Sequence, residues 1–275
     1  MTPPDIFDRH ARRRLFERAQ SSATDNRWLI ARMAGEIVAR LETVRRPFTR
    51  ALIMGTRDEQ IEATLNSMGV RFVYAALSAN LTGAAPMVQC DEDRLPFADA
   101  SFDLVMSIGT LDTVTDVPGA LMLIRRILKP DGLFLGAMIG FDSVPLLKSI
   151  LQAIEPEVSR THPLIEVRSA GDLLARAGFS MPVADLDAVT VRYAKLKTMI
   201  TDLRSNGLSN CLATRPRMKR NWLDQAMMRF DESDRTETFS IIFLSGWGPV
   251  ASEAVHTSAS RSPIRGRSAG GMSIE

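Results

Sequence analysis

The sequence has few cysteines and histidines, and this limits the chemistry that it can carry. Its 275 residues include two cysteines, Cys90 and Cys211, which form no Cys-x-x-Cys pair. This predicts a reducing compartment and no disulfide framework. The three histidines are His10, His162 and His256. His10 lies in a basic segment, His162 precedes a proline, and His256 lies in a polar tail. We therefore expect no iron site of two histidines and a carboxylate, and no metal site of another kind.

Long apolar runs and a large excess of one charge are also lacking. No apolar run reaches the roughly 18 residues that span a bilayer. Acids and arginines interrupt the N-terminal region, so it does not read as a secretory signal. The formal net charge is +2, which does not indicate a nucleic-acid partner. We expect a cytoplasmic protein, with peripheral association with the inner membrane as an alternative. No nucleophile motif is present, so no catalytic residue is assigned.

The two ends of the chain differ from its middle. Residues 1–47 are expected to form a basic helical arm, in which Ile6 to Ala19 reads as an amphipathic helix. Its apolar side, formed by Phe7, Ala11 and Leu15, would dock on the body while the arginines at 12 to 14 stay solvated. The alternative is an arm that meets an acidic partner or an anionic surface. Residues 251–275 are rich in Ser, Gly and Arg, which predicts a disordered tail.

Between these ends, apolar strand-like runs alternate with helical patterns. Strands are expected at 51–54, 71–77, 87–90, 102–108 and 133–139, and helices at 28–41, 59–68 and 117–128. Pro130 to Gly132 has the composition of a turn that closes the last of these helices. This alternation predicts an α/β fold with a parallel sheet covered on both faces. Ligands bind such sheets beyond the carboxyl ends of the strands, so we expect a site in the turns after Met54, Leu77, Cys90 and Ile108.

The stretch from Val88 to Met138 carries a family resemblance. Its "CDEDRLPFADASFDLVMSI" and "LKPDG" segments resemble the class I S-adenosylmethionine-dependent methyltransferases. The resemblance implies a Rossmann-like, seven-stranded, mostly parallel sheet over residues 48–250, with S-adenosylmethionine as cofactor. The N-terminal stretch, "DLRSNGLSN" and "FSIIFLSGWGP" are similar to one group within that superfamily. These are the methyltransferase-like assembly factors of respiratory complex I, an arginine hydroxylase group, and their alphaproteobacterial relatives, which are kin to malonyl-carrier-protein methyltransferases.

The resemblance assigns cofactor positions, and several have changed. The glycine-rich turn retains Gly55, but Arg57 and Glu59 stand for its second and third glycines. The acid that takes the ribose hydroxyls falls at Ala76, which Leu77 follows. Charge-assisted hydrogen bonds contribute roughly 1.5–3 kcal/mol each, so this loss weakens the expected binding. The positions that are retained at the adenine loop and the fourth strand are Asp91, Glu92, Ser107 and Leu111.

Two interpretations of the first turn remain open. In one, Arg57 pairs with the carboxylate of a bound amino-acid group, so that the cofactor still binds. In the other, Asp58 caps a helix that begins at Glu59, and the turn only connects strand to helix.

Residues 142–230 are expected to cover the substrate side of the sheet. Helices are expected over 143–154 and 169–179, the second with Ser169 as its N-cap, and a strand over 187–193. The resemblance implies substrate contacts at Tyr193, Arg204 and Asn210, although Tyr193 also suits a half-buried core position. Methyl transfer asks mainly for positioning of the methyl group. The sequence therefore favours a methyltransferase-like protein that uses S-adenosylmethionine. The alternative is a non-methylating assembly factor whose partner is a protein such as a respiratory complex subunit, and an enzyme of biotin synthesis is disfavoured.

Overall fold

The computed structural model describes residues 5–22, 26–79 and 85–250. The strands are β1 (Arg50–Gly55), β2 (Arg71–Ala76), β3 (Met87–Gln89), β4 (Phe102–Ile108), β5 (Leu128–Ile139), β6 (Ser180–Arg192) and β7 (Thr236–Trp247). The helices are α1 (Arg9–Gln20), α2 (Trp28–Thr43), α3 (Glu59–Ser67), α4 (Val117–Ile127), α5 (Pro145–Ile154), α6 (Val167–Arg176), α7 (Leu196–Ser205) and α8 (Trp222–Glu232). The tail predicted over 251–275 lies outside the described residues.

The seven strands form one sheet in the order β3-β2-β1-β4-β5-β7-β6. The pairs among β1 to β5 are all parallel, and β7 pairs antiparallel with both β5 and β6. The strand order reverses between β1 and β4, which is the point where ligands bind in such sheets. The prediction of a Rossmann-like, mostly parallel sheet of seven strands is therefore confirmed.

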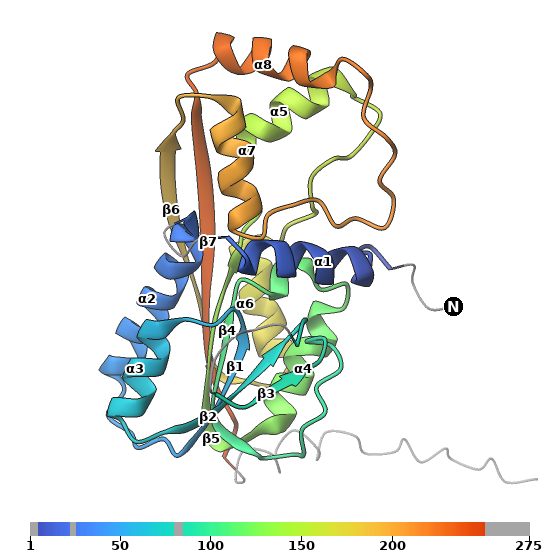
Figure 1. Ribbon diagram of the computed structural model, residues 1–275. Coiled ribbons are helices and arrows are strands. Elements are labelled where there is room, and N and C mark those ends of the chain that lie inside the picture. The colour runs from blue at the N-terminus through green and yellow to red at the C-terminus, as the bar shows by residue number, and fades with distance from the viewer. Residues whose placement is uncertain (1–4, 23–25, 80–84, 251–275) are drawn as a thin grey trace, which may run out of the picture.

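Helices cover both faces of this sheet (Figure 1). On one face α2 buries Met33 and Ile37 against the strands, and on the other α4 buries Leu121 and Ile124. The central strands are apolar on both sides, as Leu104 and Val105 of β4 pack in opposite layers. Strands that are buried on both faces read as continuous apolar runs, which is why the sequence located them.

Several boundaries differ from the expected ones, and three of the differences have a clear physical reason. α6 begins at Val167 with Glu166 as its N-cap residue, two positions before the predicted start, and Ser169 is inside the helix. β6 begins at Ser180, because its whole length finds a partner in β7. The expected turn at Pro130 to Gly132 belongs to β5 instead. Asp131 has a φ of 62° there, and its N–H donates to the carbonyl of Gly248, which directly follows the antiparallel neighbour β7.

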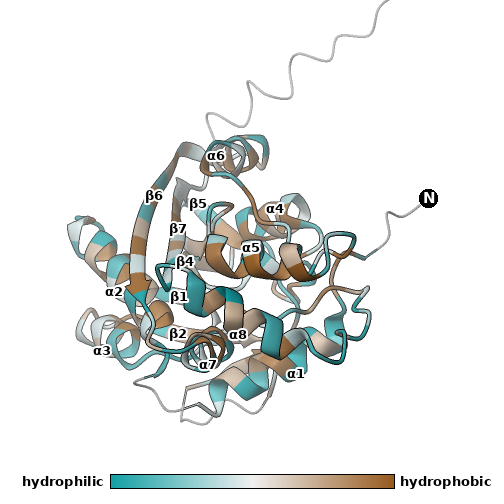
Figure 2. Ribbon diagram, turned by 90° about the horizontal axis from the view of Figure 1, so that it is seen from above, coloured by the Kyte–Doolittle hydropathy of each residue, from teal (hydrophilic) through white to brown (hydrophobic). Residues whose placement is uncertain are grey.

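The helices α5, α7 and α8 stand beyond the carboxyl ends of the parallel strands. α7 and α8 lie in the connection between β6 and β7, and α5 follows β5. Figure 1 shows α1 crossing between this upper group and the sheet below it, and Figure 2 views the same helices from above. The edge of the sheet where a ligand is expected is thus roofed by helices from the two ends of the chain.

Candidate functional site

The helix α1 lies across the turns that follow the parallel strands. Asp8 caps its first turn by accepting a hydrogen bond from the Ala11 N–H. Its side chains then contact four turns in succession. The contacts are Gln20 to Thr56 after β1 (2.6 Å), Glu17 to Ser78 after β2 (2.6 Å), Arg12 to Glu92 after β3 (2.7 Å) and Arg12 to the Thr110 carbonyl after β4 (2.7 Å). These are the turns in which the sequence predicted a site.

Arg12 is buried, although the sequence led us to expect a solvated arginine. Its side chain is 6% exposed and that of Glu92 is 5% exposed. The guanidinium also donates to the Thr113 hydroxyl, so all three nitrogens have an acceptor. The expectation was wrong because the acceptors come from turns about 80 to 100 positions away in the sequence. Helical periodicity carries no information about such partners.

Two further arginines of α1 bind the acidic loop after β3. Arg9 makes two hydrogen bonds to the Asp93 carboxylate, at 2.8 and 2.5 Å, and lies 3.2 Å from Asp91. Arg13 donates to the same Asp91 oxygen at 3.0 Å. The hydrogen bonds from Arg9 lower the pKa of Asp93. The loop that the family resemblance assigns to the adenine therefore holds α1 in this structure.

The apolar side of α1 docks on the segment after α7, as predicted. Phe7 and Ala11 pack against Cys211 and Leu212, with Leu15 beside them. His162 stacks edge-on against Phe7, with ring centroids 5.2 Å apart. This docking fixes α1 between the sheet and the upper helices.

His162 and Cys211 lie close together, but their protonation states do not suit nucleophilic catalysis. The His162 Nε2 accepts the Cys211 N–H at 2.9 Å and is 3.5 Å from its sulfur. Burial, with Arg12 nearby, lowers the pKa of His162 to about 4. Burial raises the pKa of Cys211 to about 12. At neutral pH the pair is therefore a neutral imidazole and a thiol, and no thiolate is available to attack a substrate. No cluster of three His, Cys, Asp or Glu side chains suited to a metal occurs in the described ranges.

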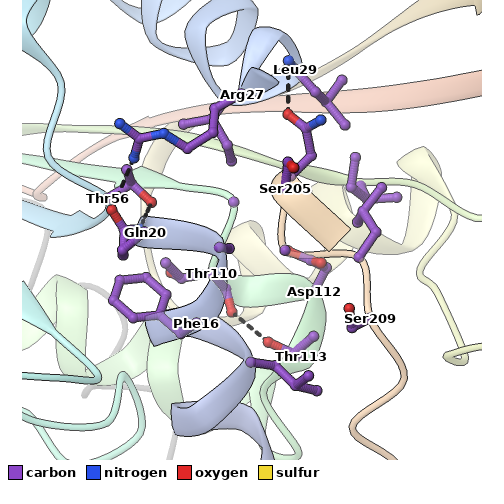
Figure 3. Close-up of a pocket in the computed structure, with 18 of the residues that line it drawn as sticks. Phe16, Gln20, Arg27, Leu29, Thr56, Thr110, Asp112, Thr113, Ser205 and Ser209 are labelled. Carbon is purple, nitrogen blue, oxygen red and sulfur yellow. Dashed lines mark hydrogen bonds between the residues drawn. The ribbon is translucent and has the colours of Figure 1, made fainter. Parts of the chain in front are cut away.

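A small cavity lies under α1, and polar groups surround it (Figure 3). Phe16 and Gln20 of α1, Thr56 after β1, Thr110 and Asp112 after β4, and Asn206 after α7 line a volume of about 50 Å³. That volume holds a few waters, whereas sites for drug-sized ligands measure roughly 300–1,000 Å³. A cofactor of that size enters only if α1 moves outward.

Four buried polar atoms in the described chain make no hydrogen bond: Arg13 Nε, Arg27 Nε, Asp91 Oδ1 and Asp112 Oδ1. All four belong to α1, to the residue that precedes α2, or to the turns after β3 and β4. Arg27 and Asp112 line the cavity itself, and Asp91 is bound by arginines of α1. Burial raises the pKa of Asp112 to about 6. Buried polar atoms without partners are rare in proteins, so the two that belong to lining residues, Arg27 Nε and Asp112 Oδ1, indicate a place for a polar ligand or water.

A second and larger cavity adjoins the first one. It measures about 360 Å³ and lies between α1, α5, α7 and α8. Its walls are mostly apolar, and Arg18, Arg160 and Arg204 are the charged side chains among the described residues that line it, apart from the neutral His162. The two cavities share Leu15, Ile139, Leu208 and Ser209. A molecule in the larger cavity would therefore lie next to one in the smaller cavity.

The structure brings together some of the cofactor positions that the resemblance assigned. Leu77 lines the small cavity, and Asp91 and Glu92 bind arginines of α1 without lining it. Gly55 has a φ of 113°, and a Cβ there would lie 2.5 Å from the Ile108 carbonyl oxygen, so this glycine is required by strand packing alone. Ala76, Ser107 and Leu111 are buried and are not among the residues that line either cavity.

The turn after β1 leads directly into α3. Asp58 caps α3 by accepting from the Ile61 N–H, as predicted. Arg57 makes a two-pronged ion pair with Glu62 of α3, at 2.5 and 2.7 Å, and Glu62 also accepts from the Tyr74 hydroxyl. Arg57 is therefore directed along α3, and it is absent from the lining of both cavities.

The three expected substrate residues fall in two places. Arg204 and Asn210 both line the larger cavity, where the Asn210 amide donates to the Arg160 carbonyl. Tyr193 is buried in the core, and its hydroxyl donates to Asp202, which also accepts from the Trp28 indole. The sequence left two positions open for Tyr193, a substrate contact or the core, and the side chain lies in the core.

Several site residues were not found from the sequence. Arg12, Gln20, Thr56 and Thr110 form the contacts under α1, and Arg18 lines the larger cavity. The burial of Arg12 could have been suspected only from its place on the helix face that also carries the buried residues Ala11 and Ala19. An arginine at that place is equally compatible with a solvated side chain. Thr56 and Thr110 carry no pattern that distinguishes them from ordinary turn residues.

Known proteins resemble this chain in sequence and in fold. Residues 61–136 match the family described as "Methyltransferase domain". The chain is 32% identical over 272 residues to "Arginine-hydroxylase NDUFAF5, mitochondrial" of Danio rerio, covering 91% of this chain and 85% of that protein. The human protein of the same name is also 32% identical, over 91% of this chain and 79% of its own length. A malonyl-[acyl-carrier protein] O-methyltransferase of Methylovorus sp. is 31% identical over 61% of this chain and 58% of that protein.

Solved structures share the fold at low sequence identity. The YcgJ protein of Bacillus subtilis has a TM-score of 0.55 at 12% identity, covering 78% of this chain and 99% of that one. A phosphoethanolamine N-methyltransferase of Haemonchus contortus, solved with phosphomonomethylethanolamine and S-adenosylhomocysteine, has a TM-score of 0.50 at 16% identity, covering 78% and 53%. The sheet order and the matched domain agree with these comparisons, and the sequence match to the NDUFAF5 proteins runs through nearly the whole chain. The chain is therefore a methyltransferase-domain protein that belongs to the arginine-hydroxylase NDUFAF5 family.

Proposed function

We propose that this protein binds S-adenosylmethionine under α1, at the carboxyl ends of β1 to β4, and acts on a substrate in the adjoining larger cavity. The observation that carries the proposal is that two buried polar atoms without a hydrogen-bond partner, Arg27 Nε and Asp112 Oδ1, belong to residues that line the small cavity. A third such atom, Asp91 Oδ1, lies in the loop after β3, which binds α1. Asp112 follows β4, which borders the switch point of the sheet, where ligands bind in this class of fold.

The fit of the cofactor to these residues depends on α1. Asp91 offers a free oxygen to a hydroxyl or amine, and Thr110 and Leu77 line the small cavity. No carboxylate stands at Ala76, and the cavity of about 50 Å³ opens to cofactor size only when α1 shifts. When bound, S-adenosylmethionine supplies an activated methyl group. The protein would then exclude water by closing α1 and would hold the substrate in the larger cavity.

Titration calorimetry of the full chain with S-adenosylmethionine and S-adenosylhomocysteine tests this proposal. We expect micromolar binding that Asp91→Asn weakens at least tenfold, because the amide gives up one acceptor and the charge. Asp99→Asn is the matched control, since Asp99 is in the same loop region and is 78% exposed. Absence of binding at millimolar ligand would overturn the proposal and leave the fold as a protein-binding platform.

A second candidate function is recognition of an arginine side chain on a partner protein, as the name of the NDUFAF5 relatives suggests. Glu92, Thr113 and the Thr110 carbonyl form a cradle that holds the guanidinium of Arg12 within the chain. A partner arginine could take the same acceptors if α1 withdrew. On this proposal the partner is a respiratory complex subunit, and the protein is cytoplasmic with peripheral contact to the inner membrane. Among the described residues, no helix has the length and apolarity that crossing a membrane requires.

Chemical rescue tests the cradle. In Arg12→Ala, methylguanidinium at millimolar concentration should raise the melting temperature, and Arg14→Ala should not respond, because Arg14 is exposed on the same helix. Equal responses of the two variants would show that the cradle has no specific affinity for a guanidinium.

A further inference from the structure

The larger cavity carries positive charge that nothing in its lining neutralises. Arg18 comes from α1 and Arg204 from α7, and these two helices pack on each other. Both arginines are exposed, and neither makes an ion pair with a described residue. Arg160 differs from them, because it is bound to Glu155 at 2.5 Å and to the carbonyls of Pro216 and Arg217. No aspartate or glutamate belongs to the described lining of the cavity.

Much of the rest of the wall is apolar, and three helices contribute large apolar side chains to it. Leu147 and Leu151 of α5, Ile200 and Leu203 of α7, and Trp222 of α8 face the cavity. Figure 2 shows that α5 is hydrophobic over much of its length. The volume of about 360 Å³ is within the range of sites that enclose a small organic molecule. Apolar walls with a few well-placed charged groups are the usual composition of such sites.

We propose that the larger cavity binds an amphipathic anion, an aliphatic chain that ends in a carboxylate. The chain would lie against Leu151, Leu203 and Trp222, and the carboxylate would pair with Arg18 and Arg204. Guanidinium groups match a carboxylate in shape and charge, and they bind it through paired hydrogen bonds. A ligand that carried a guanidinium or an ammonium would meet only like charge from these two residues. The cavity therefore selects against a partner's arginine side chain.

The role of this ligand as the substrate rests on the proposed function. The four residues shared with the small cavity would put the bound anion beside the cofactor. Binding of the anion itself does not require the cofactor, so it can be tested without it.

The test uses three probes of equal chain length with the full protein and no cofactor: decanoate, decanol and decylammonium, each below its micelle concentration. Calorimetry gives the affinities, and quenching of Trp222 fluorescence reports where the probe binds. We expect decanoate to bind at least fivefold more tightly than decanol, and decylammonium to bind most weakly. Trp222→Phe should remove the decanoate-dependent change in fluorescence, because the other two tryptophans, Trp28 and Trp247, are not in the lining.

Charge-neutralising variants identify the arginines. Arg18→Gln and Arg204→Gln should each weaken decanoate binding five- to tenfold, and the double variant should bind decanoate no better than decanol. Arg71→Gln is the matched control, because Arg71 is an exposed arginine at the amino end of β2, away from both cavities. Equal affinity for decanoate and decanol, or decanoate binding that both single variants leave unchanged, would overturn the proposal. If the protein binds decanoate but shows no binding of S-adenosylmethionine, the proposed cofactor site is refuted and the proposed anion site still stands.

Discussion

Removing the buried guanidinium of Arg12 tests whether α1 is an integral part of the domain. Arg12→Ala deletes three hydrogen bonds, each 2.7 Å long, to Glu92, Thr113 and the Thr110 carbonyl. It leaves the Glu92 carboxylate, whose side chain is 5% exposed, without its cation. Breaking a buried ion pair by removing one partner costs about 3–5 kcal/mol, because the remaining charge stays desolvated. In a domain of this size 1 kcal/mol corresponds to roughly 2–4 °C, so the melting temperature should fall by about 6–20 °C.

Urea denaturation followed by circular dichroism measures the loss in the free energy of unfolding. Arg14→Ala is the matched control, since it removes an exposed arginine from the same helix and should change the stability by less than about 0.5 kcal/mol. Arg12→Met combined with Glu92→Met should recover most of the loss, because no buried charge then remains. A loss below about 1 kcal/mol for Arg12→Ala, or losses that simply add in the double variant, would refute the buried pair as the contact that holds α1.

Three further variants or treatments probe the same edge of the sheet. Gly55→Ala should lower the free energy of unfolding by more than the roughly 1 kcal/mol expected for a positive φ alone, because the new Cβ would lie 2.5 Å from the Ile108 carbonyl oxygen. Gly69→Ala is the control in the same urea experiment. Gly69 has a φ of 70° and no atom within 4 Å of an added Cβ, so this variant measures the cost of the positive φ alone. Burial holds the pKa of Asp112 at about 6 against an ordinary 3.8, so the folded state binds this proton more tightly than the unfolded state does. Its stabilising effect is complete below about pH 4 and disappears as the pH rises through 6. The stability of the wild type relative to Asp112→Asn should therefore fall by on the order of 2–3 kcal/mol between pH 4 and pH 7, and a flat difference in urea titrations would contradict this. Burial raises the pKa of both cysteine thiols to about 12, so iodoacetamide at pH 7.5 should alkylate the native protein far more slowly than the unfolded chain, as mass spectrometry would show.

The strands and the sheet were predictable because their signal is local. β4, for instance, is a run of buried residues between polar turns, and parallel pairing of such runs follows from the helices between them. The ends of α6 and β6 were less predictable, because they depend on which residues find a partner in the neighbouring strand. Local propensity fixes the existence of an element more firmly than it fixes its first residue.

The site was only partly predictable because its contacts join distant segments. Asp91 and Leu77 were located by their place after strands, and Arg204 and Asn210 by their likeness to a family segment. Leu77 lines the small cavity and Arg204 and Asn210 line the larger one, whereas Asp91 binds arginines of α1. Arg12 was missed because its acceptors lie in turns that no periodicity links to α1. The free energy of a charged side chain depends on whether those acceptors surround it, so burial of an arginine can be recognised only in the folded arrangement.

The altered first turn does not by itself decide whether the cofactor binds. Arg57, which replaces the second glycine, is held by Glu62 along α3, and Glu59 is an exposed residue at the start of that helix. Neither side chain lines the small cavity, so their bulk is not what limits its volume. Phe16 and Gln20 of α1 limit that volume instead. The Gln20 amide also donates a hydrogen bond to the hydroxyl of Thr56, the residue after Gly55. A protein whose binding-competent state is rarely populated binds more weakly in proportion to that population. If S-adenosylmethionine binds under α1 as proposed, its affinity would therefore depend on the free energy of moving α1, to which the Arg12 and Glu92 pair contributes, more than on the two missing glycines.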